Sequence, residues 1–326
     1  MPMRVIENAL DFIVRASKDF WDASLTPEQQ LKYSTIELFE GLELLLKARL
    51  MQVHSGFILK NIDSYNKSNF DSGDFVSVNF ETACSRIESF CGTGFEKGEY
   101  SCFNNLRKLR NRYVHFHCNE SKEAVLGIQV QAWHHILHRL ENGFLGQLSA
   151  NHTNALETAR TNMLRSEEFL QVRYNESLPI LKQAKMKGLM ILECYICGMQ
   201  ACIVGDGEAS CPVCNSHPDI VSIADHFEKK NDPWWKHPKE GVDDDIAWCI
   251  WCDKQAIVHA TGSLAELVKN KLEPVDREPG EDLEFYICLS CSATAVGYWR
   301  RKCSFCGAYY FDKSTESPCP ACGHTR

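Results

Sequence analysis

Apolar residues recur in steps of three, four and seven from the start of the chain to about Leu189, which is the spacing of helices with one buried face. The clearest stripe comprises Leu31, Leu38, Phe39, Leu42, Leu45 and Leu46. Thr26 precedes this stripe as a suitable N-cap, and Pro27 suits the first helical position. Strand-like alternation is nearly absent before Leu189, so the pattern predicts a helical bundle in which short loops join antiparallel neighbours.

The same periodicity predicts the remaining helices of this part. They are expected at 4–21, 79–91 and 99–117, and then from a cap at Ser121 through 131–140 and 155–174. Residues 61–78 are polar and broken by Gly73, so a loop is expected there. Pro179 is expected to end or bend the last helix, because proline lacks the backbone N–H that a helix interior uses.

The composition changes after Leu189, where cysteine, glycine, proline and tryptophan become frequent and helical periodicity fades. Two short helices are expected near 218–229 and 263–271, and the acidic run from Asp243 to Asp245 is expected to be a solvated face. The fold class predicted is therefore mainly α, with short β-hairpins after the bundle. The predicted order is a bundle at 1–188, a zinc ribbon at 189–217, a linker at 218–245, a second zinc-binding module at 246–298 and a third ribbon at 299–326.

Most of the cysteines lie in this last part of the chain and occur in pairs. Twelve of the 17 cysteines form six C-x-x-C pairs, an arrangement that in a cytosolic chain favours metal binding over disulfides. The pairs are Cys194 and Cys197, Cys211 and Cys214, Cys249 and Cys252, Cys288 and Cys291, Cys303 and Cys306, and Cys319 and Cys322. The other five, Cys84, Cys91, Cys102, Cys118 and Cys202, are expected to act as small buried hydrophobes.

The spacing of the pairs predicts three metal sites. Thirteen residues separate the first two pairs and twelve the last two, as in zinc ribbons with four thiolates around one ion. The middle two pairs lie 35 residues apart and are joined because no other partners are left, with His259 as a rival ligand. Four cysteines leave no open position for a substrate, so three structural Zn²⁺ ions are expected, with rubredoxin-like iron as the alternative.

Bulk composition sets the broad class. The chain has 326 residues, 44% of them hydrophobic, and a formal net charge of −8, which suits about two globular domains. This net negative charge is unlike that of proteins that are basic overall because they cover nucleic acid. Any nucleic-acid site is therefore expected to be a local basic patch. No apolar run approaches the ~20 residues that span a bilayer, and the charged N-terminal segment is a poor signal peptide. A soluble, cytoplasmic protein with no membrane partner is expected.

One local basic patch precedes a histidine in "LRKLRNRYVHFH", residues 106–117. On a helix, Asn111 and His115 share a face, and Arg110 lies about 100° away, so the three can border one cleft. A guanidinium suits a phosphodiester, and an imidazole can exchange protons at neutral pH. These parts suffice for metal-independent cleavage of RNA by its own 2′-hydroxyl. The plain alternative is a basic surface helix that happens to carry one histidine.

The R-N-x-x-x-H pattern of Arg110, Asn111 and His115 resembles the signature of HEPN-domain ribonucleases. "LFEGLELLLKARL" (38–50) resembles the earlier core helix of that family, and a long helix follows the motif in the expected order. The resemblance covers roughly residues 1–150, with the helix up to residue 188 as an extension, and the zinc units lie outside it. It implies a helical bundle that pairs as a homodimer, with the two motifs facing each other across a cleft.

The resemblance also implies roles for the motif residues. Arg110 would bind or polarise the scissile phosphate, Asn111 would hold it or orient the histidine, and His115 would be the general base or acid, giving a 2′,3′-cyclic phosphate. Such proteins commonly act as toxins or in phage defence, so an antitoxin or a defence-system partner is expected. In the subgroup silenced by nucleotidyltransferase antitoxins, tyrosine stands two residues after the histidine, whereas this chain has His117.

Other features have simpler interpretations. Glu43 and Lys47, four apart, can line the cleft but are expected to form a helix-surface ion pair. The histidines of "HHILH" (134–138) are expected to be packed or exposed rather than metal ligands, and "PWWKHP" (233–238) to cover a zinc core rather than stack on bases. The alternative function is a non-catalytic HEPN and zinc-ribbon adaptor that binds nucleic acid or protein, and in a further alternative the ribbons are scaffolding only.

Overall fold

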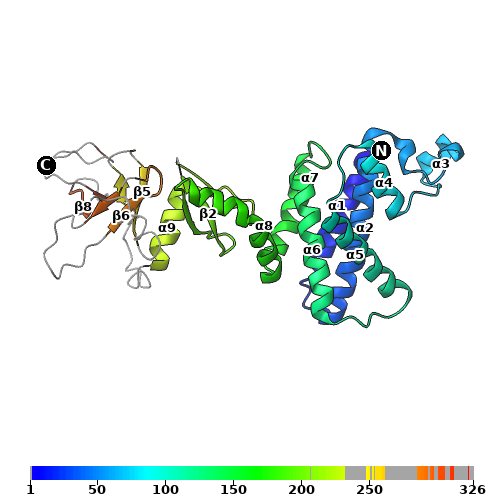
Figure 1. The fold of residues 1–326 in the computed structure, drawn as a ribbon, viewed down its shortest axis with the longest axis horizontal. Coiled ribbons are helices and arrows are strands. Elements are labelled where there is room, and N and C mark those ends of the chain that lie inside the picture. The colour runs from blue at the N-terminus through cyan, green and yellow to red at the C-terminus, as the bar shows by residue number, and fades with distance from the viewer. Residues whose placement is uncertain are drawn as a thin grey trace. The chain divides into compact units, whose positions relative to one another are not determined.

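The chain divides into two compact units, Met1–Val172 and Arg173–Arg326 (Figure 1). The computed structural model describes residues 2–205, 207–231, 247–249, 252, 254–260, 285–292, 294–296, 300–304, 309–311 and 322. Over these residues the protein is mainly helical with small sheets, in agreement with the fold class expected from the sequence.

The first unit is built of helices. They are α1 (Pro2–Asp19), α2 (Pro27–Val53), α3 (Lys67–Ser72), α4 (Phe80–Phe90), α5 (Lys97–His115), α6 (Lys122–Glu141) and α7 (Ala150–Met163), with 3-10 turns η1 (Ser55–Ile58) and η2 (Ile62–Ser64). The helices expected at 4–21, 79–91 and 99–117 are confirmed to within about two residues at each end. Local rules set several of these starts, since the side chains of Thr26, Asn79 and Ser121 all accept N-cap hydrogen bonds.

The expectation of a plain loop at 61–78 is wrong, because the segment contains η2 and α3. Asn66 caps α3 by accepting a hydrogen bond from the backbone N–H of Asn69, and Gly73 ends it in the left-handed conformation (φ +83°). Phe70 is buried and stacks on Phe75, with ring centroids 5.0 Å apart. One buried aromatic side chain thus anchors a turn of helix whose polar composition predicts a loop.

The expected stripe on α2 forms the centre of the core. Leu38, Phe39, Leu42, Leu45 and Leu46 are buried there. They meet the largest fully buried side chains of the neighbouring helices, which are Phe80 of α4, Phe103 of α5 and Trp133 of α6. As a result α5 packs against both α2 and α6, which fixes the face of α5 that meets solvent (Figure 1).

The helical stretch expected at 155–174 is interrupted once. The chain leaves the helix between α7 and α8 (Glu167–Met186), and the hydroxyl of Ser166 accepts a hydrogen bond from the N–H of Phe169 at 3.2 Å. Pro179 lies inside α8 and does not end it. Burial of Leu181 and Ala184 beyond the proline keeps the helix intact despite the lost backbone hydrogen bond. The division between the two units falls within α8.

The second unit carries the strands. β1 (Met190–Glu193), β2 (Gln200–Gly205) and β3 (Glu208–Ser210) form an antiparallel sheet, followed by α9 (Ile220–Asn231), which confirms the helix expected near 218–229. The second sheet has the order β7-β6-β5-β4-β9-β8. Its strands are β4 (Ala247–Cys249), β5 (Lys254–His259), β6 (Phe285–Cys288), β7 (Thr294–Val296), β8 (Arg300–Lys302) and β9 (Tyr309–Phe311).

This second sheet joins strands from two modules that the sequence predicts separately. β4 pairs with β9 in parallel, with Trp248 opposite Tyr310. The strands described within 246–298, β4 to β7, and those within 299–326, β8 and β9, therefore belong to one hydrogen-bonded sheet. The helix expected at 263–271, the acidic run at 243–245 and the aromatic segment at 233–238 lie outside the described residues.

Candidate functional site

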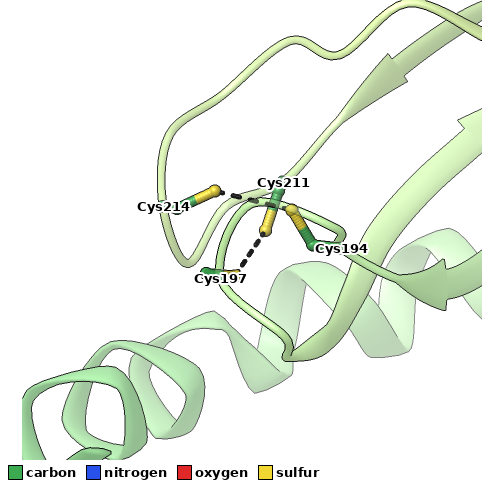
Figure 2. Close-up of side chains that lie close together, drawn as sticks. All are labelled: Cys194, Cys197, Cys211 and Cys214. Carbon is green, nitrogen blue, oxygen red and sulfur yellow. Dashed lines mark hydrogen bonds between the residues drawn. The ribbon is translucent and has the colours of Figure 1, made fainter. Parts of the chain in front are cut away.

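Four cysteines from two turns converge next to the first sheet (Figure 2). Cys194 and Cys197 lie in the turn between β1 and β2, and Cys211 and Cys214 lie in the turn after β3. The Sγ atoms of Cys194 and Cys214 are 3.7 Å apart, and those of Cys197 and Cys211 are 3.8 Å apart. All four sulfur atoms lie within 4.8 Å of one another. The antiparallel sheet brings the two turns together, as the spacing of the pairs predicts.

These distances fit a metal ion held by four thiolates. Sulfur atoms at about 2.3 Å from a central ion in a tetrahedron lie about 3.8 Å from each other. A disulfide would need about 2.05 Å between sulfur atoms. The four thiols are therefore spaced as ligands and not as oxidised pairs, and Cys194, Cys211 and Cys214 are buried.

The backbone of each turn supports this spacing. The residue after the second cysteine has a positive φ in three turns: Gly198 (+72°), Asn215 (+56°) and Ser292 (+58°). In two of them the N–H of that residue donates to the carbonyl of the first cysteine, from Gly198 at 2.7 Å and from Ser292 at 2.9 Å. A left-handed residue there folds the chain back, so that both thiols of a pair point to one side.

Electrostatics favours a cation inside the first cluster. Hydrogen bonds from Cys197, and then from Cys211 and Cys214, hold the pKa of Cys194 below that of an ordinary thiol. The neighbouring Cys194 in turn raises the pKa of Cys211. Hydrogen bonds between the thiols thus favour a thiolate at Cys194 and a protonated thiol at Cys211 in the cluster without an ion. Four thiolates require a divalent cation between them.

A side chain that the spacing of the cysteines does not reveal supports the first cluster. The hydroxyl of Ser216 lies 2.9 Å from the Cys214 sulfur and 3.9 Å from the Cys194 sulfur. A hydroxyl at this distance can donate to a thiolate and fix its orientation. The only sequence signal for this residue is a serine two positions after a C-x-x-C pair.

The middle pairs also come together. Cys249 ends β4 and Cys288 ends β6, and the Sγ distances are 3.6 Å from Cys249 to Cys291 and 3.7 Å from Cys252 to Cys288. These four cysteines form one group able to hold a metal ion. The backbone of His259, the rival ligand, lies on β5 opposite Tyr286, and its side chain lies outside the described part of the structure. The sheet formed by β4, β5 and β6 closes the gap of 35 residues that separates the pairs in sequence.

The third expected site is described in part. The Sγ atoms of Cys303 and Cys322 lie 3.8 Å apart, the separation seen in the other two clusters. Cys306 and Cys319 lie outside the described residues. Two four-cysteine groups that can hold metal ions are thus present, together with half of a third with matching spacing.

The basic motif occupies the C-terminal half of α5. The helix continues to His115, so Asn111 and His115 share a face as expected. Arg110 donates through Nε to Glu40 Oε1 at 3.0 Å and through Nη1 to Asn111 Oδ1 at 3.1 Å. His115 is exposed, and Phe116 after it is 82% exposed. The structure thus brings Arg110 and Asn111 together and leaves His115 open to solvent at the helix end.

Carboxylates accompany the other arginines of this stretch. Arg107 pairs with Glu81 on α4 at 3.0 Å, and Arg112 pairs with Glu120. Lys108 is exposed. The positive charge of this basic patch is therefore largely compensated within the folded protein. A polyanion would have to compete with these carboxylates for the arginines.

Tyr113 occupies a different environment from the exposed motif face. It is half-buried, and burial, with a hydrogen bond to Cys118 as a smaller cause, raises the pKa of its phenol. His117, at the position where one HEPN subgroup has tyrosine, is exposed. The half-buried phenol of Tyr113 is therefore a poor substitute for an exposed tyrosine hydroxyl at position 117, which a nucleotidyltransferase could reach.

The ion pair expected on α2 is confirmed. Lys47 Nζ and Glu43 Oε1 form an ion pair at 2.7 Å on α2. In "HHILH", His134 is buried and His138 exposed, with their rings stacked 5.8 Å apart. Within the described part of the chain, the groups able to hold a metal ion are the two cysteine clusters, and the histidines are not among them.

Comparison with known proteins adds no relative. No family model, no curated protein and no solved structure matches the chain. Among the helices in the described residues, none is long and apolar enough to cross a membrane.

Proposed function

We propose that this protein is a metal-independent endoribonuclease of the HEPN type whose zinc ribbons have a structural and recognition role. The observation that carries the proposal is the arrangement at the end of α5. There the Arg110 side chain donates a hydrogen bond to that of Asn111, and His115 follows one turn later on the same face as Asn111, exposed to solvent. A fixed guanidinium and an accessible imidazole on one helix are the two groups that phosphodiester cleavage needs.

In the proposed reaction the RNA cuts itself with help from these side chains. The 2′-oxygen forms a bond to phosphorus while the bond from phosphorus to the 5′-oxygen breaks. His115 accepts the proton of the 2′-hydroxyl or supplies one to the leaving 5′-oxygen, and the second copy of His115 in a homodimer performs the other transfer. Arg110 stabilises the extra negative charge on the phosphate oxygens. The products are a 2′,3′-cyclic phosphate and a 5′-hydroxyl.

We propose Zn²⁺ as the ion of the cysteine clusters. Four thiolates close the coordination shell, so the ion contributes folding stability and no reactive position. The ribbons then hold a surface that selects an RNA or a protein partner. With this arrangement we propose a cytoplasmic toxin or phage-defence effector, restrained by an antitoxin or another component of a defence system.

A non-catalytic adaptor is the second candidate, and one observation favours it. Arg107, Arg110 and Arg112 are each paired with a carboxylate, which lowers the attraction for RNA at the motif. In this case the bundle serves as an interaction module, and the ribbons bind nucleic acid or protein.

RNA cleavage by three proteins separates the two candidates. His115→Ala is expected to lower the rate by about 10²–10⁴-fold, the usual contribution of a general acid or base. His117→Ala is the matched control, because it removes an exposed imidazole two residues away and is expected to leave the rate unchanged. Equal rates for wild type and His115→Ala, with both proteins folded, would establish the adaptor instead. Cyclic-phosphate ends on the products would identify the 2′-hydroxyl as the nucleophile.

A further inference from the structure

The guanidinium of Arg110 is held from two sides. On one side, Nε donates to Glu40 Oε1 at 3.0 Å, and Nη2 donates to the same oxygen atom. On the other side, Nη1 donates to Asn111 Oδ1 at 3.1 Å. The face of the guanidinium lies near Phe39, with Cζ 5.9 Å from the ring centroid. Residues from two helices, α2 and α5, therefore fix both the position and the plane of this side chain.

The pattern of these bonds leaves donors for a substrate. A guanidinium has five N–H groups, and the three hydrogen bonds to described residues use one each on Nε, Nη1 and Nη2. One N–H on each of Nη1 and Nη2 is left over. Two donors on neighbouring nitrogen atoms match two oxygen atoms of one phosphate. Glu40 thus holds the inner edge of the guanidinium while its outer end can still bind a phosphodiester.

The helix that carries Glu40 provides a rigid base. The next residue, Gly41, lies against α1 so closely that an added β-carbon would be 2.7 Å from Ile13 Cγ1. The side chains of Glu40 and Arg110 are 30% and 25% exposed, so the pair is partly shielded from water and yet accessible. A carboxylate on a well-packed helix can hold a guanidinium far better than a flexible surface residue.

We propose that Glu40 is a positioning residue of the ribonuclease site, which orients Arg110 toward the scissile phosphate and thereby acts on the chemical step. This inference rests on the proposed function. Glu40 does not touch the substrate in this arrangement, since its carboxylate would repel a phosphate, and it acts through the guanidinium of Arg110. Its loss is expected to affect turnover more than substrate binding, because the charge of Arg110 is retained while its orientation is lost.

The same helix offers a matched control. Arg107 pairs with Glu81 at 3.0 Å one helical turn before Arg110, but Arg107 lies outside the motif. Glu40→Ala and Glu81→Ala each remove one carboxylate that holds an arginine of α5. Glu40→Gln keeps an oxygen that can accept from Nε and Nη2 and removes only the charge. Steady-state cleavage of single-stranded RNA by wild type, His115→Ala and these three variants gives kcat and KM for each.

Glu40→Ala is expected to lower kcat about 10- to 100-fold, with KM changed by less than about threefold. Glu40→Gln is expected to recover most of this loss, and Glu81→Ala to cleave like wild type. A readout independent of cleavage is the ¹⁵N–¹H signal of the Arg110 Nε group, assigned with Arg110→Lys. In Glu40→Ala its exchange with water should become faster, because the hydrogen bond to the carboxylate is gone.

The outcomes distinguish this inference from the proposed function. If cleavage depends on His115 but Glu40→Ala cleaves as fast as wild type or faster, the inference is overturned and the ribonuclease stands. An Nε signal that is unchanged in Glu40→Ala also overturns it. If wild type shows no cleavage that depends on His115, the ribonuclease and the role of Glu40 in it are both overturned.

Discussion

Gly41 on α2 lies against Ile13 on α1, and a β-carbon built on Gly41 would be 2.7 Å from Ile13 Cγ1 and 3.1 Å from the carbonyl oxygen of Ala9. Two helices can approach this closely only where one of them lacks a side chain. The contact therefore fixes the packing of the first two helices and supports the segment of α2 that carries Glu40.

Gly41→Ala is expected to destabilise the first unit. Alanine favours a helix, but its methyl group would overpack this contact at a cost of about 1–3 kcal/mol in the free energy of unfolding. Gly127→Ala on α6 is the control, because a β-carbon there meets nothing within 4 Å and should raise the free energy of unfolding by up to ~1 kcal/mol. Urea unfolding followed by helical circular dichroism measures both. Equal stability of the two variants would show that α1 and α2 lie farther apart.

Metal content should depend on Cys194 and not on Cys202. Both thiols are buried, but Cys194 belongs to the four-cysteine cluster, whereas burial, as the largest cause, raises the pKa of Cys202 to about 12 and keeps it a neutral thiol. Cys194→Ser is expected to lower the bound metal by about one ion per chain and to destabilise the second unit. Cys202→Ser should retain the full content. Elemental analysis of the purified proteins gives the stoichiometry, and an equal loss in both variants would argue against the cluster as the site.

The second cluster gives a separate test of ligand identity. Cys252→Ser is expected to remove about one metal ion per chain, because its sulfur lies 3.7 Å from that of Cys288 within the four-cysteine group. His259→Ala is expected to leave the content unchanged, because four cysteines already close a tetrahedral shell. Loss of metal from His259→Ala with retention in Cys252→Ser would reverse the assignment.

Cys84 should resist alkylation and contribute to loss of stability in alkali. Burial, as the largest cause, raises the pKa of its thiol from 9.0 to about 12. At pH 9 the thiolate fraction falls from about one half to about one thousandth, so iodoacetamide should react several hundred times more slowly than with the unfolded chain. Mass spectrometry of the Cys84 peptide, with and without urea, measures the ratio. Similar rates in both states would contradict the buried environment.

The same pKa shift sets the direction of the pH dependence. The unfolded chain loses the Cys84 proton near pH 9, whereas the folded protein holds it to about pH 12. Over this window the folded state binds more protons, so the free energy of unfolding falls as the pH rises, by at most about 1.4 kcal/mol per pH unit from this group. Cys84→Ala is expected to be less sensitive to alkali than wild type, and an equal slope would count against this thiol as a source of the loss.

Sequence by itself determined those features that depend on neighbours along the chain. The periodicity of apolar residues predicted the helices of the bundle, and the caps at Thr26 and Ser121 follow from side chains that reach backbone groups three residues away. The separations of the C-x-x-C pairs likewise predicted the first cysteine cluster, because a hairpin of this length brings two turns together. The R-N-x-x-x-H pattern placed Asn111 and His115 on one face, since helical geometry alone fixes that relation.

Only the tertiary structure decided which distant groups meet. Nothing in the spacing of the chain pairs Glu40 with Arg110, which lie 70 positions apart, because that contact depends on how α5 packs against α2. The same holds for the backbone pairing of Trp248 with Tyr310 in the second sheet, and for the grouping of Cys249 with Cys291. A local pattern fixes the conformation of a segment, whereas the burial of apolar faces against each other fixes the partners of its polar side chains. Packing, and not the motif itself, therefore supplied the carboxylates of Glu81 and Glu40 that compensate the charge of Arg107 and Arg110.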